Sequence, residues 1–191
     1  MHEVRIHGRG GQGAVLALKL LTKALVLEGK WAVGIPSFGF ERRGAPVAAF
    51  LRFDDHEIRM MTNIYDPDYV LCIDPSVADV VDILAGVQEG GTLVQATKSR
   101  PESLELPERI ATVGVCDAVG IALEVFGKSI TNTVMLGAFA RTTGLVSLES
   151  LEAGLQDPTM FRDAAVEQNI AAVRRGYAET TVQQRQGGVQ Q

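Results

Sequence analysis

A glycine-rich loop between a predicted strand and a predicted helix is the feature that most restricts how this chain can fold. Residues 3–7, EVRIH, alternate polar and apolar side chains, which is typical of a short strand. In the HGRGGQG stretch that follows, Gly8, Gly10 and Gly13 have the G-x-G-x-x-G spacing of a tight strand-to-helix turn. Such a turn presents backbone N–H groups to a phosphate. Without a ligand, the same turn only packs a helix on a strand.

The residues after the turn complete a βαβ unit. The Ala- and Leu-rich run 14–28 favours a helix, and Gly29 is placed to end it. Residues 31–35 favour a second strand, which Pro36 ends. A strand, helix and strand in this order predict a parallel pair.

The middle of the chain departs from simple alternation of strand and helix. Segments 47–53 and 57–61 predict an antiparallel hairpin. The apolar run 69–73 predicts a strand covered on both faces, and 76–86 predicts a helix with Ser76 as its N-cap. Later segments predict two further strands and then four helices: 90–97, 108–115, 117–127, 132–144, 147–156 and 160–179.

These segments predict an α/β fold. Its expected form is a Rossmann-like, doubly wound, mostly parallel sheet with an inserted β-hairpin and a C-terminal helical segment. Residues 1–179 are expected to form one domain. Residues 180–191, TTVQQRQGGVQQ, are polar and Gln-rich, which predicts a flexible tail unless a partner holds it.

Composition excludes several classes of protein. A net charge of −5 argues against a general nucleic-acid binder, because no broad basic surface is available. Cys72 and Cys116 are the two cysteines, too few for a four-thiolate cluster or a disulfide framework. We expect both to be core thiols rather than nucleophiles. The N-terminus lacks an apolar signal core and no long apolar run follows, which predicts a soluble cytoplasmic protein without a membrane partner.

A second loop carries two arginines. In IPSFGFERRGAP, Arg42 and Arg43 follow Glu41, and Gly44 and Pro46 shape the loop. Because this loop follows the second strand, we expect it near the carboxyl ends of the strands, where arginine's planar fork suits phosphates and carboxylates. Three interpretations stay open: one side of an anion site shared with the glycine turn, a pair with Glu41 beside a solvated arginine, or an interface anchor.

The dinucleotide interpretation of the glycine turn lacks its most specific residue. An NAD site needs an acidic residue at the end of the second strand to hold the ribose hydroxyls. Glu28 has the right count but precedes the glycine that ends the helix, and no acid follows the second strand until Glu41. No convincing metal set or combination of acid, base and nucleophile is evident either. We therefore expect one part of a larger enzyme.

Three segments, RIHGRGGQGAV, IPSFGFERRGAPV and IYDPDYVLCIDP, resemble the gamma subunit of the 2-oxoacid:acceptor (pyruvate:ferredoxin) oxidoreductase family. The resemblance runs from about Val4 to about Ala178. It implies a complex that oxidatively decarboxylates a 2-oxoacid with coenzyme A, yielding acyl-CoA, CO2 and reduced acceptor. Thiamine diphosphate and Mg²⁺ would lie in alpha and beta subunits, with 4Fe–4S clusters in the beta or a ferredoxin-like delta subunit. An added flavin subunit would allow NAD as acceptor.

For this chain the resemblance implies a structural and CoA-facing subunit. The backbone N–H groups of four residues would hold a CoA phosphate, namely Gly10, Gly11, Gln12 and Gly13. Arg42 and Arg43 would add charge or dock the alpha subunit. The implied site residues are Gly8, Gly10, Gly11, Gln12, Gly13, Ser37, Arg42 and Arg43. Two alternatives stay open: an assembly module that touches no ligand, and a self-sufficient NAD(P)-binding reductase. Pyruvate, 2-oxoglutarate, branched-chain and aryl oxoacids fit equally well.

Overall fold

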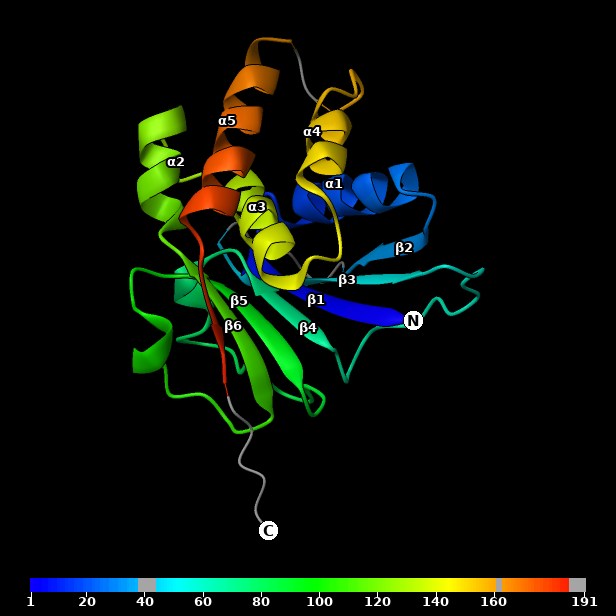
Figure 1. Ribbon diagram of the computed structural model, residues 1–191, viewed down its shortest axis with the longest axis vertical. Coiled ribbons are helices and arrows are strands. Elements are labelled where there is room, and N and C mark those ends of the chain that lie inside the picture. The colour runs from blue at the N-terminus through cyan, green and yellow to red at the C-terminus, as the bar shows by residue number, and fades with distance from the viewer. Residues whose placement is uncertain (38–43, 161–162, 186–191) are drawn as a thin grey trace.

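A seven-stranded sheet with helices on one face forms the protein (Figure 1). The computed structural model describes residues 1–37, 44–160 and 163–185. The strands are β1 (His2–Arg9), β2 (Trp31–Pro36), β3 (Pro46–Asp54), β4 (Tyr69–Cys72), β5 (Gly91–Ala96), β6 (Ile110–Cys116) and β7 (Thr181–Gln184). The helices are α1 (Ala14–Leu27), α2 (Ala118–Phe126), α3 (Asn132–Thr143), α4 (Leu148–Leu155) and α5 (Asp163–Glu179), with 3-10 turns η1 (Pro75–Val77) and η2 (Pro101–Ser103).

The sheet has the strand order β2-β3-β1-β4-β5-β6-β7. Strands β1, β4, β5 and β6 are parallel neighbours, whereas β3 runs antiparallel to β1 and β2, and β7 antiparallel to β6. From β1 the chain moves to one side of the sheet, and from β4 it moves to the other. The junction of β1 and β4 is therefore the topological switch point, beside which open α/β sheets bind ligands. The mixed α/β class with a mostly parallel sheet is confirmed.

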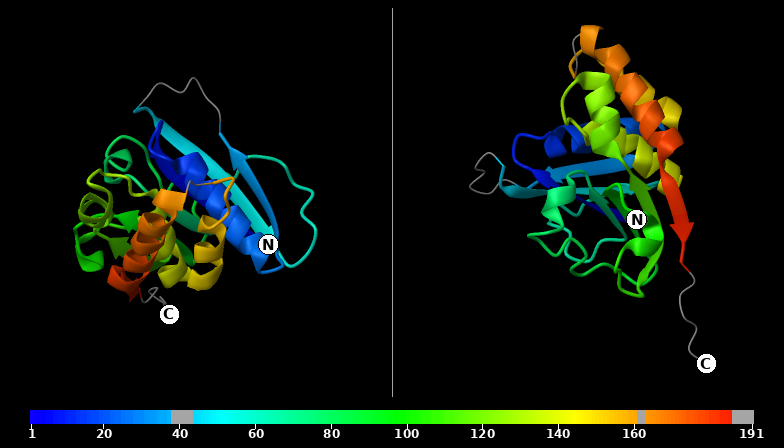
Figure 2. Two further views of the ribbon diagram at one scale, coloured as in Figure 1. Left: turned by 90° about the horizontal axis from the view of Figure 1, so that it is seen from above. Right: turned by 90° about the vertical axis from the view of Figure 1, so that its left-hand side faces the viewer.

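The two faces of the sheet are covered differently. All five described helices pack on one face, as both views of Figure 2 also show. Side chains alternate along the strands, so Leu71 faces the helices while Val70 and Cys72 face away. Turns around Val77, Ile83 and Val87 cover that second face. Strand β4 is thus buried on both faces, as its apolar run predicts.

The prediction of a helix at 76–86 is wrong. Only the short 3-10 turn η1 forms, and its cap is Asp74, whose carboxylate accepts from the Ser76 N–H at 2.8 Å; Ser76 is not the N-cap. The physical reason lies on β1. The buried guanidinium of Arg5 donates to the carbonyls of Ile83 at 3.0 Å and Ala85 at 2.6 Å, so these groups accept from a side chain rather than from a helical N–H.

The predicted hairpin of 47–53 with 57–61 is also wrong. Strand β3 pairs on both sides with β1 and β2, and 57–61 form no strand. Arg52 holds the chain after that segment instead, donating to the carbonyls of Thr62 and Asn63. The predicted pairing of the first two strands is wrong as well. Strands β1 and β2 run in the same direction, but β3 lies between them.

The chain after Thr180 differs from the predicted flexible tail. Thr181–Gln184 form β7 at the edge of the sheet, and Arg185 donates from its backbone to the Ala111 carbonyl at 2.7 Å. The partner that holds this segment is therefore strand β6 of the same chain. Residues 186–191 lie outside the described residues. Among the described residues, no helix combines the length and apolar character needed to cross a bilayer.

Candidate functional site

The glycine turn lies at the carboxyl end of β1, beside the switch point. Gly11 and Gly13 have positive φ angles of 84° and 87°, a conformation that side chains disfavour. Gly13 is the N-cap of α1, and a Cβ built on it would lie 2.4 Å from Nδ2 of Asn132. A Cβ on Gly8 would lie 2.9 Å from Cγ1 of Ile73. These glycines therefore allow β1, α1 and α3 to approach closely.

The turn leaves some backbone donors open and occupies others. The N–H of Gly10 donates to the Ala45 carbonyl at 2.9 Å, and that of Gln12 donates to the Arg9 carbonyl at 3.1 Å. Within the part of the chain that the structure describes, the N–H groups of Gly11, Gly13 and Ala14 have no acceptor. Of the four predicted donors, Gly11 and Gly13 are open within the described residues, and Ala14 at the start of α1 adds a third. No acidic residue lies in the first turn of that helix.

Arg9 joins the glycine turn to the end of β4. Its Nε donates to Ser76 Oγ at 2.7 Å and its Nη2 to the Ser76 carbonyl at 3.0 Å. Asp74 lies 3.8 Å from Nε, and the Gly44 carbonyl accepts from Nη1 at 2.8 Å. Sequence reasoning missed this residue, although its place inside the glycine motif was a signal. The guanidinium spans the switch point and brings positive charge to the turn.

A cavity of about 310 Å³ opens at the turn. Its lining includes most of the glycine turn, and its remaining walls come from the start of α1 and from β3. The lining residues are Arg9, Gly10, Gly11, Gly13, Ala14, Val15 and Val47. Open N–H donors, a guanidinium and a helix N-terminus therefore meet at one cavity, which is the donor set that a phosphate requires.

The other predicted site residues lie in different surroundings. The Gln12 side chain is exposed to solvent. Ser37 follows β2, where its N–H donates to the Ala48 carbonyl at 3.2 Å. Arg42 and Arg43 lie outside the described residues. Gly44, the next residue in the chain, donates to the Gly10 carbonyl at 3.1 Å, so the chain rejoins the glycine turn directly after the two arginines.

Glu28 does not supply the carboxylate of an NAD ribose site. It follows α1, at the opposite end of the helix from the turn. There its Oε1 accepts from the Ser147 N–H at 2.7 Å and from Ser147 Oγ at 2.8 Å, next to the start of α4. The carboxylate is therefore used to join two helices. This geometry agrees with the sequence argument against a dinucleotide.

In the described part of the chain, no nucleophile or metal set accompanies the turn. Burial raises the pKa of Cys72 to about 12 and that of Cys116 to about 11, so both thiols stay protonated at neutral pH. Among residues 1–37, 44–160 and 163–185, no group of three His, Cys, Asp or Glu could hold a metal ion. The described site can bind and orient an anion, but it offers no group for covalent chemistry.

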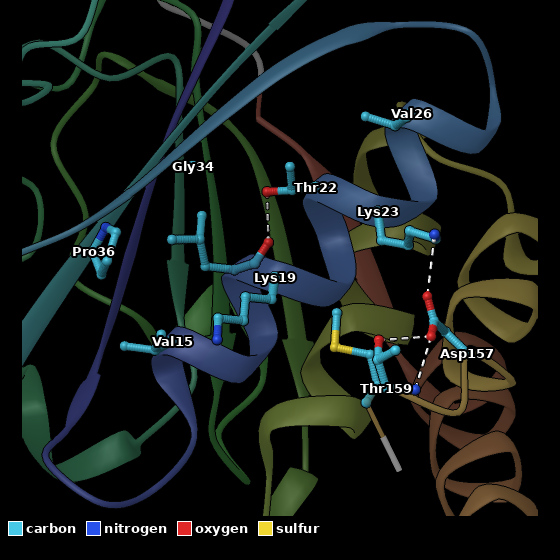
Figure 3. A pocket seen from close by; sticks show the side chains of 11 residues that line it. Val15, Lys19, Thr22, Lys23, Val26, Gly34, Pro36, Asp157 and Thr159 are labelled. Carbon is cyan, nitrogen blue, oxygen red and sulfur yellow. Dashed lines mark hydrogen bonds and ion pairs between the residues drawn. The ribbon is translucent and has the colours of Figure 1, made fainter.

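A larger groove lies on the other side of α1, next to β2 (Figure 3). Its volume is about 440 Å³, its walls are mostly apolar, and it meets the glycine-turn cavity at Val15. Lys19 and Lys23 stand at its rim, and Nζ of Lys23 pairs with Asp157 at 3.1 Å. Two neighbouring hollows thus share the first turn of α1.

The fold and the turn together define a Rossmann-like domain whose open backbone donors lie at the topological switch point. A family model described as "Pyruvate ferredoxin/flavodoxin oxidoreductase" matches residues 3–179, and the chain belongs to this family. The sequence-based assignment is confirmed.

Relatives and solved structures agree on the kind of subunit. The chain is 61% identical, over 95% of both chains, to the gamma subunit of NADH-dependent phenylglyoxylate dehydrogenase from Aromatoleum evansii. It is 48% identical, over 95% of this chain and 98% of the other, to the common gamma subunit of pyruvate/ketoisovalerate oxidoreductases from Thermococcus litoralis. The crystal structure of pyruvate oxidoreductase subunit PORC from Thermotoga maritima superposes with a TM-score of 0.82 at 34% identity, covering 96% and 98% of the two chains. The protein is thus a gamma subunit of a multi-subunit 2-oxoacid oxidoreductase complex.

Proposed function

We propose that this subunit binds coenzyme A for its complex. The overall reaction takes a 2-oxoacid, CoA and an oxidised acceptor to acyl-CoA, CO2 and reduced acceptor, with two electrons passing to the acceptor. The observation that carries the proposal is the set of open N–H groups at Gly11, Gly13 and Ala14, which face a cavity beside the switch point. A phosphate of CoA has the charge and acceptor oxygens that these donors require.

The residues around the turn have separate roles in this proposal. Gly11 and Gly13 keep the backbone open to the phosphate, and the N-terminus of α1 adds its positive dipole end. Arg9 holds the turn against Ser76 and contributes charge. Arg42 and Arg43 add charge to the same anion or dock the alpha subunit. Gln12, with its exposed side chain, and Ser37 line the approach.

The carbon chemistry belongs to partner subunits in this proposal. Alpha and beta chains would hold thiamine diphosphate with Mg²⁺, the cofactor that stabilises the acyl carbanion after decarboxylation. The beta chain or a ferredoxin-like delta chain would hold the 4Fe–4S clusters. This division agrees with two buried cysteines and no catalytic set among the described residues. We place the complex in the reducing cytoplasm, where such free thiols persist.

The substrate we propose is an aryl 2-oxoacid such as phenylglyoxylate, with NAD as the acceptor through an added flavin subunit. The support is the 61% identity to the gamma subunit of a phenylglyoxylate dehydrogenase, against 48% for a pyruvate/ketoisovalerate relative. The test is to purify the complex through a tag on this chain, without oxygen, and assay a panel of 2-oxoacids with NAD and with ferredoxin. Faster turnover with pyruvate than with phenylglyoxylate would contradict the assignment.

Paired substitutions at Gly11 test the phosphate contact. Asn and Asp both tolerate positive φ better than other side chains and have nearly the same shape. Gly11→Asp adds a negative charge beside the phosphate, so we expect its KM for CoA to exceed that of Gly11→Asn by about tenfold. The KM for the oxoacid should stay the same in both. Equal CoA values in the two variants, with partner subunits lost from the complex, would favour a pure assembly module.

A further inference from the structure

Strand β2 forms one border of the sheet, and among the described residues no strand pairs with its outer side. Its pairing with β3 is regular over the whole strand, without a bulge. Soluble proteins protect such an edge with charged side chains, with an interior proline or with a bulge. Residues 31–36, WAVGIP, carry no charge, and the proline comes last. The outer edge of β2 is therefore available for pairing with another strand.

The backbone groups that β2 leaves open follow from its pairing with β3. The Ser37 N–H donates inward to the Ala48 carbonyl at 3.2 Å. Because the direction of hydrogen bonding alternates along an antiparallel strand, the odd-numbered residues of β2 also bond to β3. The even-numbered residues point their backbone groups outward. The outer edge thus offers the N–H and C=O groups of Ala32 and Gly34.

Three apolar side chains follow the same edge. Gly34 and Pro36 line the groove beside α1, on the helix-covered face of the sheet (Figure 3). Successive side chains of a strand alternate between the two faces, so Trp31, Val33 and Ile35 lie on the opposite face. Trp31 is 53% exposed, and the other two are half-buried. The open edge therefore carries an apolar stripe that α1 does not cover.

A two-fold axis at Val33 makes this stripe self-complementary. Two antiparallel β2 strands related by this axis place Val33 opposite Val33 of the other copy, and Trp31 opposite Ile35. Ala32 of each copy then lies opposite Gly34 of the other, and these residues exchange their open N–H and C=O groups. One arrangement thus pairs both the apolar side chains and the open backbone groups.

Neighbouring registers fit less well. An axis one residue earlier in the strand would place Ile35 opposite Gly29 of the other copy. An axis one residue later would place Trp31 opposite Ser37. Cross-strand apolar pairs stabilise a sheet, so each shift loses contacts of the stripe. The side chains therefore favour the axis at Val33.

The charges along α1 favour the same antiparallel arrangement. Lys19 lines the groove beside β2 and has no ion pair within the described residues. Glu28 follows the carboxyl end of the helix and is exposed. A two-fold axis at β2 turns the basic half of each α1 toward the acidic end of the other. The helix dipoles have the same sense, so two copies are complementary in charge.

We propose that two copies of this chain pair through β2, so that their sheets join across a two-fold axis at Val33. The pairing is independent of the proposed CoA function, because it uses the outer edge of β2 and none of the open donors of the glycine turn. A stable interface buries about 800 Å² on each partner, and a six-residue strand offers less. We therefore expect a dimer that forms and dissociates with concentration.

Single cysteines test the register. Val33→Cys should form a disulfide between two copies under mild oxidation, because directly opposed residues of such a pair have Cα atoms about 4.5 Å apart. Ile35→Cys alone should not, since the axis separates its two copies by about 13 Å. A mixture of Ile35→Cys with Trp31→Cys should cross-link. The native Cys72 and Cys116 are 0% and 2% exposed, so they should not react.

Opposite charges at Val33 test the pairing without a covalent bond. In Val33→Lys and in Val33→Glu, like charges face each other across the axis, so the dimer Kd should rise at least about tenfold in each. Mixing the two variants should restore the dimer, which also shows that both variants fold. Sedimentation over a series of concentrations measures the mass of the full chain in every case.

Several outcomes would overturn the inference. They are a wild-type chain that stays monomeric at every concentration, equal cross-linking of Ile35→Cys and Val33→Cys, or no recovery in the mixture of Lys and Glu variants. The cross-linking is repeated on the assembled complex, where Val33→Cys should again link two copies of this chain. Protection of that cysteine without self-linking would assign the edge to a different subunit and contradict the proposal.

Discussion

Gly13 lies at a position of the glycine turn that has no room for a side chain. Its φ is +87°, and a Cβ would lie 2.4 Å from Asn132 Nδ2. We expect Gly13→Ala to lower the free energy of unfolding by about 2 kcal/mol or more. Gly29→Ala is the matched control, since Gly29 has a φ of +81° but no atom within 4 Å of its Cβ position. It should cost only about 1 kcal/mol. Chemical denaturation measures both, and equal losses would contradict the close approach to α3.

His7 should make stability depend on pH. It is 6% exposed, and burial, with Arg5 beside it, lowers its pKa to about 4 from 6.5. Its Nε2 accepts from Arg5 Nε at 3.0 Å, which requires the neutral ring. Below pH 6.5 the unfolded chain takes up a proton that the folded chain refuses until about pH 4, so stability falls across this window. The loss should total about 3 kcal/mol.

The comparison for His7 is His7→Gln, which keeps an acceptor but does not titrate. Denaturation at about pH 7 and about pH 5 should show a smaller loss in the variant than in the wild type. Equal losses of stability in His7→Gln and in the wild type would mean that other groups cause the pH dependence.

Of the residues discussed at this scale, sequence reasoning found the glycines because their spacing is local. It missed Arg9 and Asn132, whose roles depend on contacts with Ser76 and Gly13 far along the chain.

At the scale of elements, local pattern predicted most strands and helices but not the cover of the second face. The apolar residues of 76–86 fit a helix as well as they fit a series of turns over the sheet. What decides is Arg5 on β1, whose guanidinium also donates to the Tyr65 carbonyl at 3.2 Å. Likewise, β3 lies between β1 and β2 because it pairs with both strands. A short sequence pattern does not predict such long-range pairing.

Arg5→Met therefore should loosen the second face selectively. The substitution removes the donor to three carbonyls, those of Tyr65, Ile83 and Ala85, from a residue that is 8% exposed. We expect a loss of about 3–5 kcal/mol and faster amide hydrogen exchange at 62–66 and 83–87 than in the helices. Arg59→Met, at an exposed ion pair with Glu57, should change neither. Uniform acceleration of exchange across the chain would contradict the local role.

At the scale of the whole molecule, the position of the candidate site could be predicted from the sequence. The number of backbone donors left open in it could not. The glycine motif indicates the carboxyl end of the first strand, and this end lies at the switch point. Sequence reasoning expected four backbone donors there, yet Gly10 and Gln12 are bonded to protein carbonyls. The Gln12 bond to Arg9 closes a local turn, whereas Ala45 reaches Gly10 only when β3 pairs with β1.

If this subunit binds CoA and its partners carry out the carbon chemistry, substitutions here should separate two stages of turnover. Decarboxylation of the oxoacid needs no thiol, whereas formation of acyl-CoA does. In Gly11→Asp, single-turnover release of CO2 without CoA should match the wild type. The yield of acyl-CoA at low CoA should fall about tenfold relative to Gly11→Asn and recover at saturating CoA. Rapid quenching of labelled oxoacid measures both products. Slower CO2 release without CoA would mean that this subunit also shapes the decarboxylation site, which the described residues give no reason to expect.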